Sequence, residues 1–309
     1  MSQRSSNGLA SHQTSPEQQR RIATPVSTPS LKTGQTPCGD CALKDWIAIL
    51  SECLEEVENR VRPLYRTPQA AEDVSSGAGG DRTRRIDFEA EEAIISVLKH
   101  NDVSCTLVSE EIGILKLGSN SEVTVITDPI DGTVNAIMGI PIFGPLIAVA
   151  SGSSLNSVIA GGAMQLPSGD LYLAERGCGA TLNGKDLITR ASLPLERAVI
   201  GLDPRPPRIP APLRTDNLLR RLRHTRHLGA NGIEICFVAS GLYDAFIDTR
   251  GALRVTDIAA SSLILKEAGG LIVSPEGAKV DAVIDPKSTL SLVAACDQRI
   301  CGQILELLR

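Results

Sequence analysis

The apolar and polar positions divide the chain into an unpatterned tail and two patterned halves. Between Trp46 and Val61, apolar residues recur on one helical face, and this run stops before Pro63. A second helical pattern opens near Asp87 and continues to Leu98. Short apolar runs joined mostly by short turns then predict an antiparallel sheet with strands at 104–109, 123–127, 145–151, 157–164 and 169–174.

After about Asn183 the pattern becomes mixed, as expected of an α/β unit. Strands are predicted near 198–202, 225–228, 243–248, 271–273 and 291–295, and helices near 213–222, 231–240, 256–268 and 297–308. The predicted fold class is therefore α/β, with an α+β half at 41–184 and a mixed α/β half at 185–309. Residues 1–40 are rich in Ser, Thr, Gln and Pro, which predicts a disordered tail.

Composition narrows the class of protein. The 309 residues are 42% hydrophobic, enough for a sizeable core in one large or two medium domains. A net charge of −5 and 3% aromatic residues argue against a nucleic-acid partner. The longest apolar stretch, Ile137 to Ala150, is interrupted by Gly and Pro and is too short to span a membrane. The chain begins without the apolar core of a secretory signal, so a cytoplasmic location is expected.

The eight cysteines are scattered, which fits a reducing compartment better than a disulfide framework. Cys38 and Cys41 are spaced like half of a zinc site, but no second ligand pair lies nearby, which favours an incidental motif.

Acidic residues follow two of the predicted strands directly. Asp128-Pro-Ile-Asp131-Gly-Thr133 comes after the run 123–127, and Glu110-Glu111 comes after the run 104–109. Carboxylate and carbonyl oxygens are the ligands that Mg²⁺ prefers. A surface turn is the alternative interpretation, because Asp-Pro and Asp-Gly are ordinary turn formers. Asp87 and Asp257 stand at predicted helix starts, where capping alone explains an acid. The metal interpretation therefore depends on the whole set.

These motifs, with the loop Gly177-Cys-Gly-Ala-Thr-Leu-Asn-Gly184, resemble the inositol monophosphatase superfamily of Mg²⁺-dependent, lithium-sensitive phosphatases. The resemblance runs from about Trp46 to Arg309 and implies a layered αβαβα sandwich with the site between the two halves. Members usually form dimers, so a homodimer is expected. Phosphatases of the haloacid dehalogenase type need a nucleophilic Asp where this chain has Pro129, which argues against that class.

The resemblance also implies roles for individual residues. Two or three Mg²⁺ ions would be held, with Glu110, Asp128 and the Ile130 carbonyl around one, and Asp128, Asp131 and Asp257 around another. Asp87 and Thr133 would orient and deprotonate the attacking water, and Glu111 would stand just outside the ligand set. The backbone N–H groups of Gly132 and Thr133 follow a turn and could bind the phosphate.

Substrate contacts are predicted in two segments. The segment from His227 to Asn231 resembles the family region that contacts substrate hydroxyls, which nominates Ala230 and Asn231, although Asn231 is equally consistent with a helix cap. The segment from Phe246 to Arg254 resembles the archaeal branch, whose members hydrolyse both fructose 1,6-bisphosphate and inositol monophosphate. Arg250, Arg254 or Arg226 could hold a second phosphate, with surface salt bridges as the alternative.

The predicted function is Mg²⁺-dependent hydrolysis of fructose 1,6-bisphosphate, inositol 1-phosphate or both, by direct attack of metal-activated water. The partners expected are small phosphate esters, with no nucleic acid and no membrane. A 3′(2′),5′-bisphosphate nucleotidase is the alternative within the class. A non-catalytic metal-binding regulatory protein of the same fold is the alternative outside it.

Overall fold

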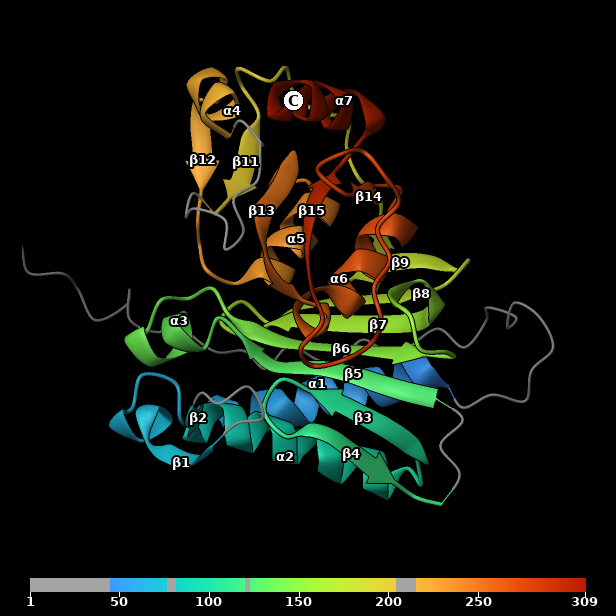
Figure 1. Cartoon of the computed structure of the whole chain (residues 1–309). Coiled ribbons are helices and arrows are strands. Elements are labelled where there is room, and N and C mark those ends of the chain that lie inside the picture. Colours follow the sequence, from blue (N-terminus) through green and yellow to red (C-terminus); the bar gives the residue numbers. More distant parts are fainter. Residues whose placement is uncertain (1–44, 77–81, 120–122, 204–214) are drawn as a thin grey trace, which may run out of the picture. The chain divides into compact units, whose positions relative to one another are not determined.

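The structure, a computed structural model, describes residues 45–76, 82–119, 123–203 and 215–309 (Figure 1). The predicted disordered tail at 1–40 and the Cys38–Cys41 pair lie outside these residues. The described residues all belong to one compact unit.

Two helices cover one face of the first sheet. Helix α1 spans Trp46–Val61 and α2 spans Arg85–His100, as the apolar periodicity predicts, and the two helices pack against each other. The Asp45 side chain accepts a hydrogen bond from the Ala48 N–H at 3.0 Å and so caps α1. Between the helices lie η2 (Pro68–Ala71), β1 (Asp73–Ser76) and β2 (Arg82–Arg84).

The first sheet has eight strands in the order β10-β9-β8-β7-β6-β5-β3-β4 (Figure 1). Its strands are β3 (Cys105–Ser109), β4 (Gly113–Leu117), β5 (Val123–Asp131), β6 (Gly144–Ala150), β7 (Val158–Gln165), β8 (Asp170–Glu175), β9 (Gly179–Leu182) and β10 (Lys185–Leu187). Helix α3 (Thr133–Met138) and η3 (Leu155–Ser157) interrupt this series.

The prediction of an antiparallel sheet is wrong for one pair, because β3 and β5 run parallel. Strand β4 folds back along the outer edge of β3, and the chain then returns to the inner edge in the original direction. Every other neighbouring pair in this sheet is antiparallel. As a result, the carboxyl ends of β3 and β5 meet at one edge of the sheet.

The second sheet has five strands in the order β12-β11-β13-β15-β14. They are β11 (Val199–Leu202), β12 (His224–Arg226), β13 (Ala245–Arg254), β14 (Leu271–Val273) and β15 (Thr289–Ala295). The helices of this half are α4 (Thr215–Arg221), α5 (Asn231–Ala239), α6 (Val255–Glu267) and α7 (Gln298–Leu308).

Helices α5 and α6 lie between the two sheets, and α7 and α4 cover the outer face of the second (Figure 1). Helix α6 is buried at every position from Val255 to Leu265, as expected of a helix enclosed by sheets on both sides. The expected αβαβα sandwich is therefore confirmed. The larger apolar core joins residues of both halves, including Leu146 and Ile233, and the division at residue 184 stays a prediction.

Candidate active site

Strand β5 carries Asp128 and Asp131 at an irregularity in the sheet. Its pairing with β6 shifts between Asp128 and Asp131, so the strand bulges where the ladder would otherwise need an N–H from Pro129. The Asp128 carboxylate accepts a hydrogen bond from the Ile130 N–H at 3.1 Å, which fixes its direction. Both acids are buried, with relative exposures of 4% each.

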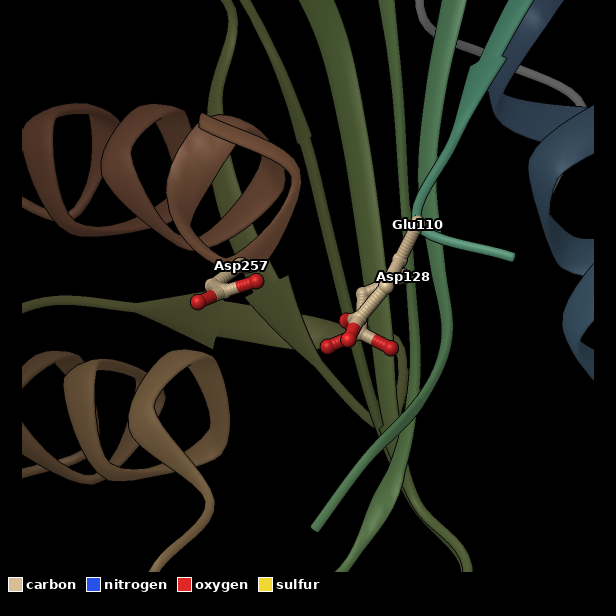
Figure 2. Close-up of side chains that lie close together, drawn as sticks. All are labelled: Glu110, Asp128 and Asp257. Atoms are coloured by element: carbon tan, nitrogen blue, oxygen red, sulfur yellow. The ribbon is translucent and has the colours of Figure 1, made fainter. Parts of the chain in front are cut away.

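Three carboxylates converge at this strand end. Glu110, Asp128 and Asp257 each offer an oxygen, and these oxygens all lie within 4.8 Å of one another (Figure 2). Glu110 follows β3 and Asp128 lies in the neighbouring parallel strand, whereas Asp257 comes from the first turn of α6. Asp257 also accepts the Arg254 N–H at 3.1 Å, so it supports the helix start as well as joining the cluster.

The geometry of this cluster fits a magnesium ion. Mg²⁺ binds oxygen at about 2.1 Å in octahedral geometry, so two ligand oxygens of one ion are about 3.0 Å apart when adjacent and about 4.2 Å apart when opposite. The three acids would have to draw together from within 4.8 Å to these spacings on binding the ion, and carboxylates are the hard donors that Mg²⁺ prefers. Glu110, Asp128 and Asp257 would therefore hold the ion.

The charges in the cluster oppose one another. Burial raises the pKa of Asp128 well above its ordinary value, and the neighbouring Asp131 and Asp257 raise it further. Burial likewise raises the pKa of Asp257. The Arg254 guanidinium forms an ion pair with Glu110 at the half-exposed side of the cluster. A further cation would relieve the repulsion among the buried acids.

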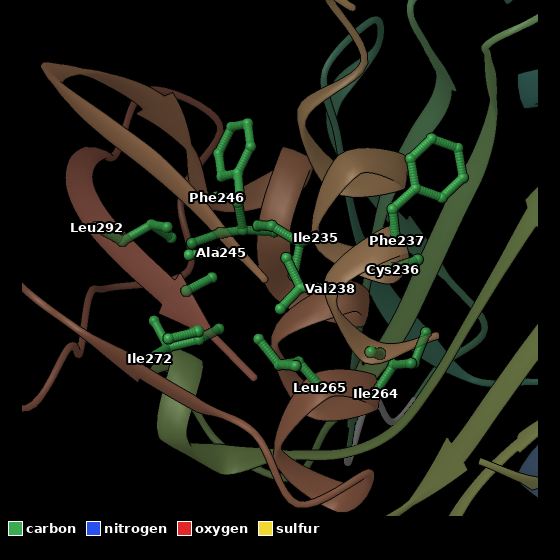
Figure 3. Packing of buried hydrophobic residues seen from close by; sticks show 14 of the residues in the cluster. Ile235, Cys236, Phe237, Val238, Ala245, Phe246, Ile264, Leu265, Ile272 and Leu292 are labelled. Atoms are coloured by element: carbon green, nitrogen blue, oxygen red, sulfur yellow. The ribbon is translucent and has the colours of Figure 1, made fainter. Parts of the chain in front are cut away.

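Asp131 contacts the second half of the chain. Its Oδ2 accepts a hydrogen bond from the Ile233 N–H in the first turn of α5 at 2.9 Å, and it lies outside the three-acid cluster. Helices α5 and α6 are fixed behind the site by a shared apolar core that includes Ile235, Val238, Ile264 and Leu265 (Figure 3). Asp131 as a ligand of a second ion stays a prediction.

Asp87 and Thr133 are in direct contact, as their predicted partnership requires. The Thr133 hydroxyl lies 2.8 Å from Asp87 Oδ1 and 3.1 Å from the Ile130 carbonyl oxygen, and its single proton can serve only one of them at a time. Burial, with the charge of Glu111 adding to it, raises the pKa of Asp87 to about 7. Glu111 itself accepts a hydrogen bond from the Thr83 hydroxyl.

The predicted substrate segment is held close to the turn at Gly132. Gly132 has φ +86°, and a Cβ there would lie 3.0 Å from the Ile142 carbonyl oxygen and 3.1 Å from the Ala230 Cβ. Ala230 is the N-cap of α5 and Asn231 is its first residue, so the interpretation of Asn231 as the cap is wrong. The substrate contacts of Gly132, Thr133, Ala230 and Asn231 stay predictions.

Arg250 lies between two buried carboxylates. Its Nε donates to Asp248 Oδ2 at 2.8 Å, and its Nη1 forms an ion pair with Asp203. Only 9% of the Arg250 side chain is exposed, against 31% for Arg254. A phosphate would therefore have to compete with Asp203 and Asp248 for Arg250. Arg254, in contrast, lies beside the three-acid cluster.

Sequence reasoning missed two buried acids that shape the site. Glu91 accepts hydrogen bonds from Ser109 and Ile112, on either side of the Glu110-Glu111 pair. Glu234 Oε1 accepts the Leu228 and Gly229 N–H groups at 3.1 Å each, which holds the segment before α5. In each case the available signal was an acid at a position where the helical pattern is apolar.

Comparison with known proteins places this site in a family. The model of the inositol monophosphatase family matches residues 42–308. The chain belongs to the inositol monophosphatase family. A protein of Methanothermobacter thermautotrophicus named fructose-1,6-bisphosphatase/inositol-1-monophosphatase is 38% identical over 272 residues, which cover 85% of this chain and 96% of that protein. The class predicted from sequence, a phosphoric monoester hydrolase, is confirmed.

Two further relatives are informative. A solved structure described as an inositol monophosphatase-fructose 1,6-bisphosphatase superposes with a TM-score of 0.76 at 30% identity, covering 86% of this chain and 100% of that one. A bifunctional NADP phosphatase/NAD kinase of Methanococcus maripaludis is 30% identical over 81% of this chain and 47% of its own length. Enzymes of this family are metal-dependent. Among the described residues, no helix has the length and apolar character needed to cross a membrane.

Proposed function

We propose that the protein is a Mg²⁺-dependent phosphatase that hydrolyses fructose 1,6-bisphosphate, inositol 1-phosphate or both. The observation that carries this proposal is the convergence of Glu110, Asp128 and Asp257 beside the Asp87–Thr133 pair. Packing alone gives no reason to bury so many acids together. Two or three ions, as predicted, would include one coordinated partly by Asp131.

Bound Mg²⁺ would offset the negative charge of the phosphate and lower the pKa of the attacking water. Thr133 donates its proton to Asp87, which leaves its oxygen lone pairs able to accept a hydrogen bond from that water. With a pKa near 7, Asp87 is able to take up the proton passed on by Thr133 close to neutral pH. The two residues thus orient the water and remove its proton.

Arg254 supports a bisphosphate substrate. Its guanidinium contacts Glu110 and remains partly exposed, so it is placed to bind the second phosphate of a substrate whose first phosphate enters the cluster. Arg250 would first have to leave Asp203 and Asp248. We therefore assign the second phosphate to Arg254 in preference to Arg250.

A homodimer and a cytoplasmic location complete the proposal. Helix α3 and the residues after it expose apolar side chains beside the site, with Val134 and Met138 each 71% exposed and Ile140 45% exposed. Exposed apolar side chains gathered together favour a protein contact. The proposal of a cytoplasmic location is supported only by the sequence.

NADP is a second candidate substrate, because one relative is named as an NADP phosphatase. The test measures phosphate release from fructose 1,6-bisphosphate, inositol 1-phosphate, NADP and adenosine 3′,5′-bisphosphate, each with Mg²⁺ and with EDTA. Mg²⁺-dependent release from either of the first two supports the proposal. Release from NADP or the nucleotide alone replaces it with that substrate.

Asp128→Asn separates catalysis from a regulatory role. The variant is expected to stay folded and to lose at least about 100-fold in turnover, the upper end of what losing an outer-shell partner costs. Asp186→Asn, at an exposed position on β10, is the matched control and should keep full activity. No turnover of any substrate by the wild-type protein would favour the non-catalytic alternative.

A further inference from the structure

Glu91 lies on α2 one helical turn after Asp87, on the side of the helix that faces the first sheet. It is 6% exposed, and its neighbours on the buried side of α2 include Ile94 and Ile95. Burying a carboxylate is unfavourable unless hydrogen bonds compensate it, and an apolar side chain would fill this position at lower cost. The contacts of Glu91 therefore indicate what the carboxylate does.

Both hydrogen bonds go to the turn that carries Glu110. Glu91 Oε1 accepts the Ser109 hydroxyl and, at 3.1 Å, the Ile112 N–H. Ser109 Oγ in turn accepts the Glu111 N–H at 3.2 Å. Ser109 precedes the Glu-Glu pair and Ile112 follows it, so one oxygen atom fixes both ends of the turn.

The turn has a further constraint from the sheet. Ser109 pairs with Gly113, so β3 and β4 close directly around residues 110–112. Sheet pairing sets where the turn starts and ends, but the direction of the Glu110 side chain depends on the backbone inside it. The bond from the Ile112 N–H and the bonds through Ser109 restrict that backbone.

We propose that Glu91 is a positioning residue that holds the Glu110-Glu111 turn so that the Glu110 carboxylate meets Asp128 and Asp257. This inference rests on the proposed function in one respect only, namely that these acids bind Mg²⁺. Helix α2 then contributes to the site in two ways. Asp87 accepts a hydrogen bond from Thr133, and Glu91 holds the turn that carries the metal ligand Glu110.

The test compares Mg²⁺ affinity in three full-length variants by calorimetric titration, with Mg²⁺-dependent melting as the second readout. Glu91→Ala should weaken Mg²⁺ binding about 10- to 100-fold, as expected when the partner that orients a ligand is lost. Glu91→Gln keeps a carbonyl oxygen that can accept both hydrogen bonds, and it should stay within about threefold of wild type. Glu92→Ala, the exposed neighbour on the same helix, should be unchanged.

A purely structural role would lower the melting temperature of Glu91→Ala and leave its Mg²⁺ affinity intact, which would overturn the inference. Equal weakening in Glu91→Gln and Glu91→Ala would also overturn it, because the carbonyl oxygen is then insufficient. Where Glu91→Ala does not fold, Glu91→Leu fills the position without an acceptor and so removes both hydrogen bonds, and wild-type Mg²⁺ affinity in that variant refutes positioning.

These titrations also separate this inference from the proposed function. Normal Mg²⁺ binding by a wild-type protein that releases no phosphate would refute the phosphatase and leave the Glu91 comparison intact. A wild-type protein that binds no Mg²⁺ would refute both.

Discussion

The buried Asp87 carboxylate should make the metal-free protein less stable as the pH rises. Its ordinary pKa is 3.8, and in the folded chain burial and the nearby Glu111 raise it to about 7. Between these values the folded chain still holds a proton that the unfolded chain has released. Stability is therefore lost as the pH rises through this range, and the loss is complete above the folded pKa.

The size of the effect follows from the pKa difference. Each unit of pKa is worth about 1.36 kcal/mol, so Asp87 costs the folded state about 2 kcal/mol at pH 5 and about 4 kcal/mol at pH 8. Asp87→Asn is neutral at both pH values, and its amide oxygen can still accept the Thr133 hydroxyl. The variant should therefore be more stable than wild type, by more at pH 8 than at pH 5.

The assay is thermal unfolding in EDTA at pH 5 and pH 8. For a chain of this size, about 4 kcal/mol corresponds to a rise in melting temperature of roughly 8 °C. Glu92→Gln, at an exposed position of α2, controls for simple loss of charge and should shift little. A variant less stable than wild type at pH 8, or an advantage independent of pH, would refute the reasoning. The same variant should lose activity, because the amide cannot accept the proton from Thr133.

Two further predictions concern buried contacts. Arg250→Met leaves Asp203 and Asp248 without their shared cation and should lower the free energy of unfolding by about 3–5 kcal/mol. The control Arg62→Met removes an exposed ion pair and should cost less than about 1 kcal/mol. Both values are measured by chemical denaturation. Equal losses would show that the buried pairs contribute little. Gly232→Ala would place a Cβ 2.4 Å from the Asp257 carbonyl oxygen, and overpacking should cost about 1–3 kcal/mol and weaken Mg²⁺ binding in a titration. Gly302→Ala in α7, where no atom lies within 4 Å of the added Cβ, is the control and should be neutral or stabilising. Unchanged Mg²⁺ affinity in Gly232→Ala would contradict the expected link between this packing contact and the metal site.

The elements that present the acids could be predicted because their signals are local. The apolar runs before Glu110 and Asp128 are contiguous in sequence, and they appear in the structure as β3 and β5. The parallel pairing of these strands depends on the path of β4, a strand that was not predicted. Helix α3 was missed for a related reason, because its six residues are too few to show a helical period.

The partners of single charged residues could not be predicted, because they are set by contacts between distant segments. Arg250 meets Asp203 only because β11 and β13 lie side by side in the second sheet. Glu91 meets the Glu110 turn only because α2 packs against the first sheet at β5, the strand next to β3. A sequence pattern can mark such residues as buried and charged, but the partner appears only when the sheet order is known.

The same burial that makes the acids useful also makes them unfavourable without a cation. Desolvation raises the pKa of Asp87, Asp128 and Asp257, so at neutral pH the empty cluster opposes folding. Mg²⁺ bound only by the folded chain would stabilise it in proportion to the affinity and the ion concentration. Metal binding and stability should therefore be coupled more strongly as the pH rises and the acids ionise. As the pH falls, protonated acids both relieve the repulsion and lose their affinity for the ion, so added Mg²⁺ should change the melting temperature less.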